Sequence, residues 1–544
     1  MNSNVDFIAI IPSQCGSKRL KDKNLQTING KTLVDYAIEY AMKSTHVSKI
    51  IVSTNSEDIK QECAKKYPTI EVFDRPDCMC GDVDVIDVYK FVVEKQLCED
   101  INKCDRKLYV VGIQPDNPDR SVRLDDAIEY CISNNYDDCL TVGHDCHRNG
   151  SLRIIDLNYA FSNGIRQPRI GILQDTCTNI HNEKDLNRAR HSMSSKTISL
   201  SNGFEIGGNR TFIIAEAACN HMCSLGLAKK MILDAKSAGA DAIKFQTYKA
   251  ETHVTCGAVS YWGNKPMKQI DYYKNLDKFG LEEYNTLFEF AYEVGIMPFS
   301  TPFDLNSARL LNSLGMEIFK IPSMAINDIE LLKEIASFGK PIVMSTGGST
   351  LQEIDRAIDV IFGENNFKLI LLACNLSYPT QNKDANLCRI KTLKDKYPNF
   401  IVGYSDHTYP DDHMVIPSLT IPMGAKVIEK HFTLDKTAIG SGQFFSIDAD
   451  DLRKMVKNIR LAETVFGNGT IDVSESEKGA VSGSRKSVVV NVPSIPEGET
   501  ILSSMIIGKR PGTGIPIDRI KDVIGKKTNK ILNYDDLIQW EDLI

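Results

Sequence analysis

Eight short apolar runs recur along the middle of this chain, and they constrain its fold more than any other feature. They occupy residues 212–215, 242–245, 297–300, 318–321, 342–345, 369–373, 401–404 and 427–430. Helix-length stretches separate them, so eight strand–helix units fit into roughly 250 residues, which is the size of a TIM barrel. Other α/β folds also contain eight strands, so the count favours a barrel without deciding it.

Polar side chains stand at the carboxyl end of each of these predicted strands. In a (β/α)8 barrel those ends converge on one face, where active sites lie. Helix N-capping explains some of the hydroxyl and carboxylate residues equally well, but it does not account for the lysines and histidines. The side chains concerned are Glu216, Lys244, Ser300, Thr301, Ser323, Ser345, Ser377, Tyr378, Ser405, Asp406, His407 and His431.

Two of these residues, His407 and His431, follow the seventh and eighth predicted strands, which are neighbours in a barrel. Two imidazoles there can hold one divalent cation and leave positions for water and a substrate carbonyl, as a Lewis-acid site requires. Core packing would better explain a lone histidine. The pair, with His407 inside Ser-Asp-His-Thr, favours a metal site.

Cations and hydroxyl donors lie on the same predicted rim. They are Lys244, Lys320, Ser323, Ser345 and Ser405. This combination suits a small polyanion that carries a phosphate and a carboxylate. A lysine is usually a solvated surface residue, but Lys244 lies within the apolar run Ile243-Lys244-Phe245-Gln246 and is expected to face a specific partner.

Composition excludes several classes of protein. The chain has 544 residues, 42% of them hydrophobic and 25% charged, which is typical of two to four globular domains rather than disorder. A net charge of −7 argues against a nucleic-acid partner. No apolar run approaches a membrane span, and Met1–Asp6 lacks the basic start of a signal peptide. The fifteen scattered cysteines form no CxxC pair and indicate reduced thiols in a cytoplasmic protein.

The first 190 residues have a different pattern. A strand at 7–12, a glycine-containing loop at 13–24, a helix at 32–43 and a strand at 49–54 begin an open parallel α/β sheet. Strands at 107–111 and 138–142 and a helix at 183–190 continue it. The sequence thus predicts a domain at 1–190, a linker at 191–210, a barrel at 211–468, a linker at 469–484 and a small domain at 485–544.

Residues 211–544 resemble the N-acetylneuraminate (sialic acid) synthase family, a TIM barrel followed by an antifreeze-like SAF domain. The resemblance covers most barrel strands and one loop of the last domain. The matching stretches are Ile214-Ala215-Glu216 with Asn220-His221, residues 239–247, Ser300–Phe303, Lys320–Ser323, Ser345–Gly347, Tyr378–Thr380, Gly403–Thr408, Ile428–Thr433 and Lys509–Gly514.

This resemblance implies condensation of phosphoenolpyruvate with an N-acyl hexosamine to a nine-carbon 2-keto-3-deoxy acid and phosphate. His407 and His431 would hold Mn2+ or Mg2+, and Glu216 would contact the sugar near the reacting carbon. Arg510 would reach the barrel of a partner subunit, which implies a homodimer built through the barrel and a swapped SAF domain. Phosphoenolpyruvate or sugar would contact Lys244, Gln246, Thr301, Lys320, Ser323, Ser345, Tyr378 and Ser405.

Two other functions remain open for this part of the chain. Synthases of 3-deoxy-octulosonate phosphate share the barrel but lack a SAF domain, so the Arg510 loop argues against them. A carbohydrate-binding module would have no reason to keep both histidines and the anion-binding residues. The sequence also departs from the family where it carries Ala325 and Gly442, positions at which carboxylates are expected near the sugar. We therefore expect a modified hexose, deoxygenated or diamino, rather than N-acetylmannosamine.

Residues 1–190 resemble the acylneuraminate cytidylyltransferases. The matching stretches are Ile10–Asn24, Ile51–Ser56, Arg75-Pro76, Asp82, Gln114-Pro115 and Asn149-Gly150. A glycine loop after a first strand can bind phosphates through backbone N–H groups while lysines neutralise the charge. The resemblance implies binding of CTP with Mg2+ by Gly16, Ser17, Lys18, Lys23, Asn24, Asp82 and Gln114.

Here, too, the sequence departs from the family pattern. The Asp-Ile-Asp expected to bind Mg2+ is replaced by Asn179-Ile180-His181, and neither replacement offers a hard anionic oxygen. Asp82, Asp175 or Asp185 is a candidate for a relocated ligand. The domain is therefore either a cytidylyltransferase that traps the synthase product, or a degenerate module for nucleotide sensing or assembly.

Overall fold

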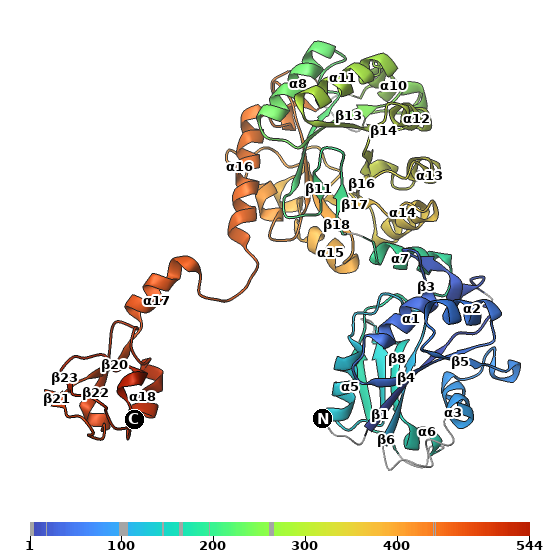
Figure 1. The fold of residues 1–544 in the computed structure, drawn as a ribbon. Helices are drawn as coiled ribbons and strands as arrows, with labels where there is room; N and C mark the ends of the chain where they lie inside the picture. The colour runs from blue at the N-terminus through green and yellow to red at the C-terminus, as the bar shows by residue number, and fades with distance from the viewer. Residues whose placement is uncertain are drawn as a thin grey trace. The chain divides into compact units, whose positions relative to one another are not determined.

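The computed structural model of the chain describes residues 5–17, 19–96, 107–143, 146–162, 167–194, 196–260, 266–438, 440 and 442–544. It separates into two compact units, residues 1–465 and 466–544. The first unit holds an open sheet followed in sequence by a closed barrel, and the second is a small β-rich unit (Figure 1). We describe each unit by itself.

The amino-terminal sheet has the strand order β5-β4-β1-β6-β8-β7-β9. Its strands are β1 (Val5–Pro12), β4 (Val47–Thr54), β5 (Glu71–Asp74), β6 (Lys107–Ile113), β7 (Asp138–Val142), β8 (Arg148–Asp156) and β9 (Ile170–Gln174). The sequence-based prediction of an open α/β sheet is confirmed. The sheet is parallel except for β8, which runs antiparallel to β6 and β7 because residues 143–147 are too few for a crossover helix.

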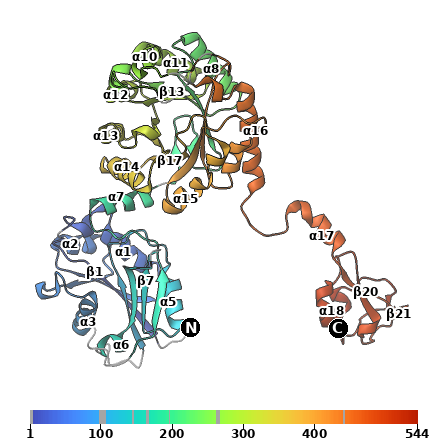
Figure 2. The same ribbon diagram turned by 180° about the vertical axis from the view of Figure 1, so that it is seen from behind.

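Helices cover both faces of this sheet (Figures 1 and 2). One face carries α1 (Leu33–Met42), α2 (Glu57–Lys66) and α5 (Leu124–Ser133), and the other carries α3 (Val85–Gln96) and α6 (Leu157–Phe161). The apolar run of β1 is buried on both sides, as expected for a central strand. A short hairpin, β2 (Thr27–Ile28) and β3 (Lys31–Thr32), follows the glycine loop.

The eight predicted strands of the middle region form a closed parallel barrel in sequence order. They are β12 (Phe212–Ala218), β13 (Ala242–Thr247), β14 (Met297–Pro302), β15 (Phe319–Ile321), β16 (Ile342–Ser345), β17 (Leu369–Cys374), β18 (Ile401–Asp406) and β19 (Val427–His431). The TIM-barrel prediction is confirmed. Figure 1 shows the helices around these strands: α8 (Leu225–Ser237), α9 (Ala250–His253), α10 (Gln269–Lys274), α11 (Leu281–Val294), α12 (Leu305–Ser313), α13 (Ile329–Ser337), α14 (Leu351–Gly363), α15 (Cys388–Lys396) and α16 (Ala449–Phe466).

Helix α14 shows how the sequence builds this outer layer. Thr350 and Glu353 form a capping box at its amino end. Ile354, Ala357 and Ile361 are buried, at the three- and four-residue spacing that places side chains on one helix face. That face packs on the barrel, while Asp355 and Asp359 lie on another part of the helix surface.

The segment predicted as a linker, 191–210, contains a hairpin of β10 (Ile198–Ser199) and β11 (Glu205–Ile206). Ile198, Leu200 and Ile206 are buried in the barrel core. The hairpin lies against the amino ends of the strands, because Ser201 bonds Glu317 before β15, and Gly207 abuts Ile401, which opens β18. The domain borders at 190 and 210 stay predictions.

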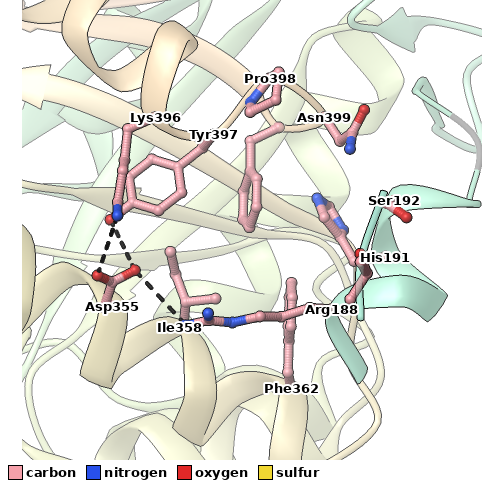
Figure 3. A pocket seen from close by; sticks show the side chains of 12 residues that line it. Arg188, His191, Ser192, Asp355, Ile358, Phe362, Lys396, Tyr397, Pro398 and Asn399 are labelled. Atoms are coloured by element: carbon pink, nitrogen blue, oxygen red, sulfur yellow. Dashed lines mark hydrogen bonds and ion pairs between the residues drawn. The ribbon is translucent and has the colours of Figure 1, made fainter. Parts of the chain in front are cut away.

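Helix α7 (Glu183–Ser192) joins the sheet domain to the barrel. One side packs Leu186 and Ala189 against the region of the glycine loop. The other side contacts the barrel: Asn187 donates to the Phe362 carbonyl at 3.1 Å, and the His191 ring lies 4.0 Å from that of Phe400. A cavity of about 180 Å³ lies beside this contact, lined by α7, α14 and residues 396–400 (Figure 3).

The second unit contains α17 (Lys478–Ser484), within the predicted linker 469–484, and a small core beyond it. Its other elements are β20 (Ser487–Val490), β21 (Ser494–Ile495), β22 (Ile506–Lys509), α18 (Ile520–Val523) and β23 (Leu532–Asn533). In the described ranges of the whole chain, every cysteine is a free thiol, and no helix is both long and apolar enough to cross a membrane.

Candidate active site

Strand register brings the predicted site residues of the barrel to its carboxyl-terminal face. Glu216 on β12 stands beside Lys244 on β13 and beside His431 on β19. Ser405 on β18 stands beside Glu429 on β19. In a closed parallel barrel the ends of all strands meet at one rim, which is why residues far apart in sequence converge here.

Two buried lysines form the centre of the site. The Lys320 Nζ lies 2.6 and 2.8 Å from the two carboxylate oxygens of Glu429. The Lys244 Nζ pairs with Glu216 and lies 3.6 Å from Glu429 Oε2. All four side chains are at least 95% buried. Two buried lysines are thus paired with two buried carboxylates, an arrangement typical of a functional site. An unpaired charge at such a buried position would be very costly.

Glu429 lies at the centre of this cluster, although the sequence analysis assigned it no role. Burial alone would raise the pKa of its carboxyl, but Lys244 and Lys320 outweigh burial and hold that pKa far below its usual range. The Ser405 hydroxyl also donates to Glu429, at 2.8 Å. Glu429 therefore stays ionised and fixes the positions of both lysines. The signal was present in the sequence, because a carboxylate inside the apolar run 427–430 needs a buried partner.

The pKa of Glu216 is shifted in the opposite direction to that of Glu429. Burial raises the pKa of its carboxyl to about 7, although Lys244 opposes that shift. The Gln246 side-chain amide donates to Glu216 Oε1 at 3.2 Å. The structure thus places Glu216, Lys244 and Gln246 together, as the sequence-based assignment required.

The predicted hydroxyl residues line the same rim. Lys244 donates to Thr301 Oγ1 at 3.0 Å, and Ser323 Oγ accepts the Gly347 N–H at 2.9 Å. Ser345 Oγ is buried and has no hydrogen-bond partner among the described residues. A ligand oxygen in this position would satisfy the Ser345 hydroxyl.

His407 and His431 lie side by side, with ring centroids 5.3 Å apart. His407 Nδ1 is 2.6 Å from the Asn375 carbonyl oxygen, which can only accept a hydrogen bond, so this nitrogen carries a proton. The Tyr378 ring packs on His407 with centroids 4.2 Å apart. Burial and the neighbouring His407 lower the pKa of His431, whose buried Nδ1 has no partner within the described ranges.

These two histidines fit a divalent metal ion. A ligand imidazole must be neutral, must offer a lone pair and is usually oriented by a hydrogen bond from its other nitrogen. The carbonyl contact orients His407 in this way, and the unpartnered Nδ1 gives His431 a free donor atom. No group of three or more His, Cys, Asp or Glu that could hold a metal occurs in the described residues.

A buried ion pair beneath the rim supports His407. The Lys430 Nζ lies 2.6 Å from Asp406 Oδ2 and 2.9 Å from the Thr408 carbonyl oxygen. Asp406 also accepts from the backbone N–H of Thr408 at 2.9 Å. These bonds fix the turn on both sides of His407, so Asp406 and Lys430 have positioning roles that the sequence analysis did not assign.

Arg510, the remaining predicted residue of the synthase part, belongs to the second unit and its side chain is exposed. It lies in the loop that follows β22, where Lys509 pairs with Asp535 at 2.5 Å. Its predicted contact with a substrate stays a prediction.

The predicted nucleotide residues lie around the loop after β1. Gly16 has a φ of 81°, a conformation that favours glycine. Lys23 pairs with Asp116 at 2.5 Å, and the Asn24 amide donates to the Gln14 carbonyl at 3.1 Å. Gln14 in turn accepts from the Gly81 N–H at 2.9 Å, which brings the exposed Asp82 close to the loop.

Three further residues were predicted to bind the nucleotide: Ser17, Lys18 and Gln114. The Gln114 amide donates to the Tyr89 hydroxyl at 3.4 Å, from the end of β6. Lys18 lies outside the described residues, and Ser17 is half-buried within the loop.

Two of the three carboxylates considered as relocated Mg2+ ligands are engaged in structural bonds. Asp175 is fully buried and accepts from Ser121 at 2.8 Å and from Ser151 at 2.5 Å. Asp185 accepts the His181 N–H at 2.9 Å at the start of α7. Both carboxylates serve the fold of the loop before α7, which leaves Asp82 as the exposed one of the three.

Comparisons with known proteins agree with this arrangement. Residues 231–471 match the NeuB family, and residues 8–152 match a family described as Cytidylyltransferase. The chain is 38% identical to N,N'-diacetyllegionaminic acid synthase of Legionella pneumophila, over 61% of this chain and 94% of that protein. It is 34% identical to a pseudaminic acid synthase of Campylobacter jejuni, over 61% and 96%.

Two further similarities extend the comparison. Human N-acetylneuraminate-9-phosphate synthase is 32% identical over 63% of this chain and 96% of its own length. The crystal structure of a putative spore coat polysaccharide biosynthesis protein E from Chromobacterium violaceum superposes with a TM-score of 0.52 at 25% identity, covering 62% of this chain and all of that one. The chain thus belongs to the NeuB family and carries a cytidylyltransferase-type domain in front of its barrel.

Proposed function

We propose that the barrel condenses phosphoenolpyruvate with an N-acyl hexosamine in its aldehyde form, consuming water and releasing phosphate and a nine-carbon 2-keto-3-deoxy acid. The observation that carries this proposal is the pair of buried lysines beside two adjacent histidines. Lys244 and Lys320 would meet the phosphate and carboxylate of phosphoenolpyruvate, with hydroxyl donors from Thr301, Ser323, Ser345 and Ser405.

Each group of side chains has a distinct task in this proposal. His407 and His431 would hold Mn2+ or Mg2+, which when bound polarises the aldehyde carbonyl as a Lewis acid. Glu429 keeps both lysines in place before the anion arrives. Glu216 lies beside Lys244 and His431 in the register and would contact the sugar near the reacting carbon. Orientation of two reactants against each other then supplies much of the rate enhancement.

We infer the acceptor from two positions at which the resemblance implies carboxylates near the sugar. Ala325 is buried and offers no hydrogen-bonding group. A Cβ on Gly442 would stand 2.9 Å from Asn220 Oδ1, so any side chain there would require the Asn220 amide to shift. We propose a modified hexose acceptor, deoxygenated or diamino. The relative at 38% identity is named for an N,N'-diacetyl product, which supports the diamino choice.

Steady-state kinetics test the acceptor directly. The full chain is incubated with phosphoenolpyruvate, Mn2+ and either N-acetylmannosamine or a 2,4-diacetamido-dideoxy hexose, and phosphate release gives kcat/KM for each sugar. We expect the diacetamido sugar to be preferred by at least about tenfold, the usual effect of mismatched polar groups. Efficient turnover of plain N-acetylmannosamine would overturn the acceptor, while leaving the condensation itself intact.

The amino-terminal domain has two candidate functions. As a cytidylyltransferase it would trap the keto acid as its CMP-sugar. The structural bonds of Asp175 and Asp185 favour the second candidate, a domain that binds a cytidine nucleotide with weak or no transfer. The full chain with CTP, Mg2+ and the synthase product decides between them: rapid pyrophosphate release that depends on Lys23 supports transfer, and its absence alongside nucleotide binding supports sensing.

We further propose a homodimer in which the barrel is completed by Arg510 of the partner subunit. The exposure of Arg510 and the two-unit organisation of the chain support this assembly. Size-exclusion chromatography with light scattering measures the assembly directly, and a monomeric chain with full activity would contradict it.

A further inference from the structure

The lysine of the amino-terminal glycine loop is already paired with a carboxylate of its own chain. The Lys23 Nζ lies 2.5 Å from Asp116 Oδ2, and only 17% and 21% of the two side chains are exposed. In a phosphate-binding loop such a lysine is the cation that meets the ligand phosphates. Here that cation has an internal anion beside it.

The backbone on both sides of this ion pair is held in place. The Asp116 carbonyl accepts the Ile180 N–H at 3.0 Å, and Asp119 accepts the Thr178 N–H at 2.8 Å. On the other side Asn24, next to Lys23, is bonded to the Gln14 carbonyl at 3.1 Å. These bonds hold the backbone that carries Lys23 and Asp116, so the two side chains stay within reach of each other.

The Asp116 carboxylate opposes the binding of nucleotides that carry several negative charges. A nucleoside triphosphate brings several negative charges toward the loop, and each is repelled by the Asp116 carboxylate, which also competes for the Lys23 ammonium. Bound Mg2+ normally offsets such repulsion, but Asp175 and Asp185 are engaged in hydrogen bonds within the fold, and only Asp82 of the three candidate ligands is exposed. A nucleoside or a nucleoside monophosphate meets far less repulsion.

We propose that Asp116 is a built-in counter-anion for Lys23, which makes the amino-terminal domain select nucleotide ligands of low charge, a nucleoside or a nucleoside monophosphate, over a triphosphate. This inference rests on the proposed nucleotide-binding role of the domain. The competing interpretation makes Asp116 a relocated Mg2+ ligand. The two interpretations predict opposite signs for the effect of removing its charge.

Isothermal titration calorimetry on the full chain tests this inference with cytidine, CMP and CTP in the presence of Mg2+. In the unsubstituted protein we expect CMP to bind more tightly than CTP. Asp116→Asn should tighten CTP binding on the order of tenfold, the effect of one charged contact, and leave cytidine unchanged. The second substitution Lys23→Gln should remove that gain.

The matched control is Glu71→Gln, which breaks the Lys49–Glu71 ion pair (2.8 Å) at the opposite end of the strands. It should alter none of the three affinities, and thermal melting shows whether each variant is folded. Unchanged or weaker CTP binding by Asp116→Asn would overturn the counter-anion while the nucleotide site stands. Absence of binding by all three ligands in both proteins would remove the nucleotide site and this inference together.

Discussion

Lys320 and Glu429 form a two-pronged ion pair inside the barrel, with both carboxylate oxygens within 2.8 Å of the lysine Nζ. Three strands of the barrel lie between the two residues in the sequence order, and the residues meet because the barrel closes. The pair is at least 95% buried, and Lys244 lies 3.6 Å from the same carboxylate. Glu429 thus pairs with two buried cations inside the barrel.

Glu429→Gln should destabilise the barrel strongly. The substitution keeps the shape of the side chain but removes the carboxylate that pairs with Lys320. Removing one partner of a buried ion pair costs about 3–5 kcal/mol of stability. Thermal and urea unfolding measure the loss. Glu334→Gln, which breaks the half-exposed pair with Arg309, should cost at most about 1 kcal/mol. Equal stability of Glu429→Gln and the unsubstituted chain would show that the lysines do not depend on this carboxylate.

Removal of either metal-binding histidine should abolish phosphate release from phosphoenolpyruvate. His407→Ala and His431→Ala each remove one of the two proposed ligands, together with ring contacts to Tyr378 and Phe445. Phosphate release and circular dichroism separate chemistry from folding. His413→Ala, a histidine away from the strand ends, is the control. Near-normal turnover of either site variant in the presence of a metal chelator would refute the metal assignment.

The contact between α7 and the barrel should weaken in acid through His191. Burial lowers the pKa of His191 from 6.5 to about 4, so the folded protein excludes a proton that the unfolded chain accepts below pH 6.5. The free energy of unfolding should therefore fall between pH 6.5 and pH 4, by at most about 3 kcal/mol, and be unaffected above pH 6.5.

His191→Phe tests this pH dependence, because phenylalanine keeps the packing against Phe362 and Phe400 but cannot be protonated. The midpoint of thermal unfolding is compared between the two proteins at pH 7.5 and pH 5. We expect the unsubstituted chain to lose more stability than the variant. The same loss in both proteins would show that His191 does not carry the effect.

Arg510 should act across the subunit interface. Arg510→Ala and His407→Ala homodimers are each expected to be inactive, but mixing and reassembling them forms heterodimers with one intact site. Such a mixture should regain about a quarter of the unsubstituted activity, because half of the randomly paired dimers carry one working site of two. A mixture that stays inactive, although light scattering shows exchanged dimers, would place Arg510 outside the site.

The sequence predicted the barrel well because its signal is local. Apolar runs such as 369–373, bounded by helix-length segments, identify strands one at a time, and the closed order then follows from their number. Site residues at strand ends, such as Lys244 and His431, could be placed for the same reason. The antiparallel strand β8 was not predicted, because the direction of a strand depends on the length of its connection.

The network beneath the site could not be predicted in the same way. Glu429 contacts Lys244 and Lys320 because the three side chains point to the barrel interior from three different strands. A one-residue change of register in any of these strands would separate them. The pairing of Lys23 with Asp116 joins a loop to the end of another strand, 93 residues away, and no periodicity marks it. Contacts of this kind become visible only once the fold is known.

One measurement tests the central claim most directly. The full chain is supplied with uniformly 13C-labelled phosphoenolpyruvate, Mn2+ and an unlabelled diacetamido hexose, and the products are weighed by mass spectrometry. The proposed condensation predicts a nine-carbon keto acid that carries all three labelled carbons, together with phosphate, and no such product from Lys244→Met. Phosphate release with labelled pyruvate as the sole carbon product would contradict it.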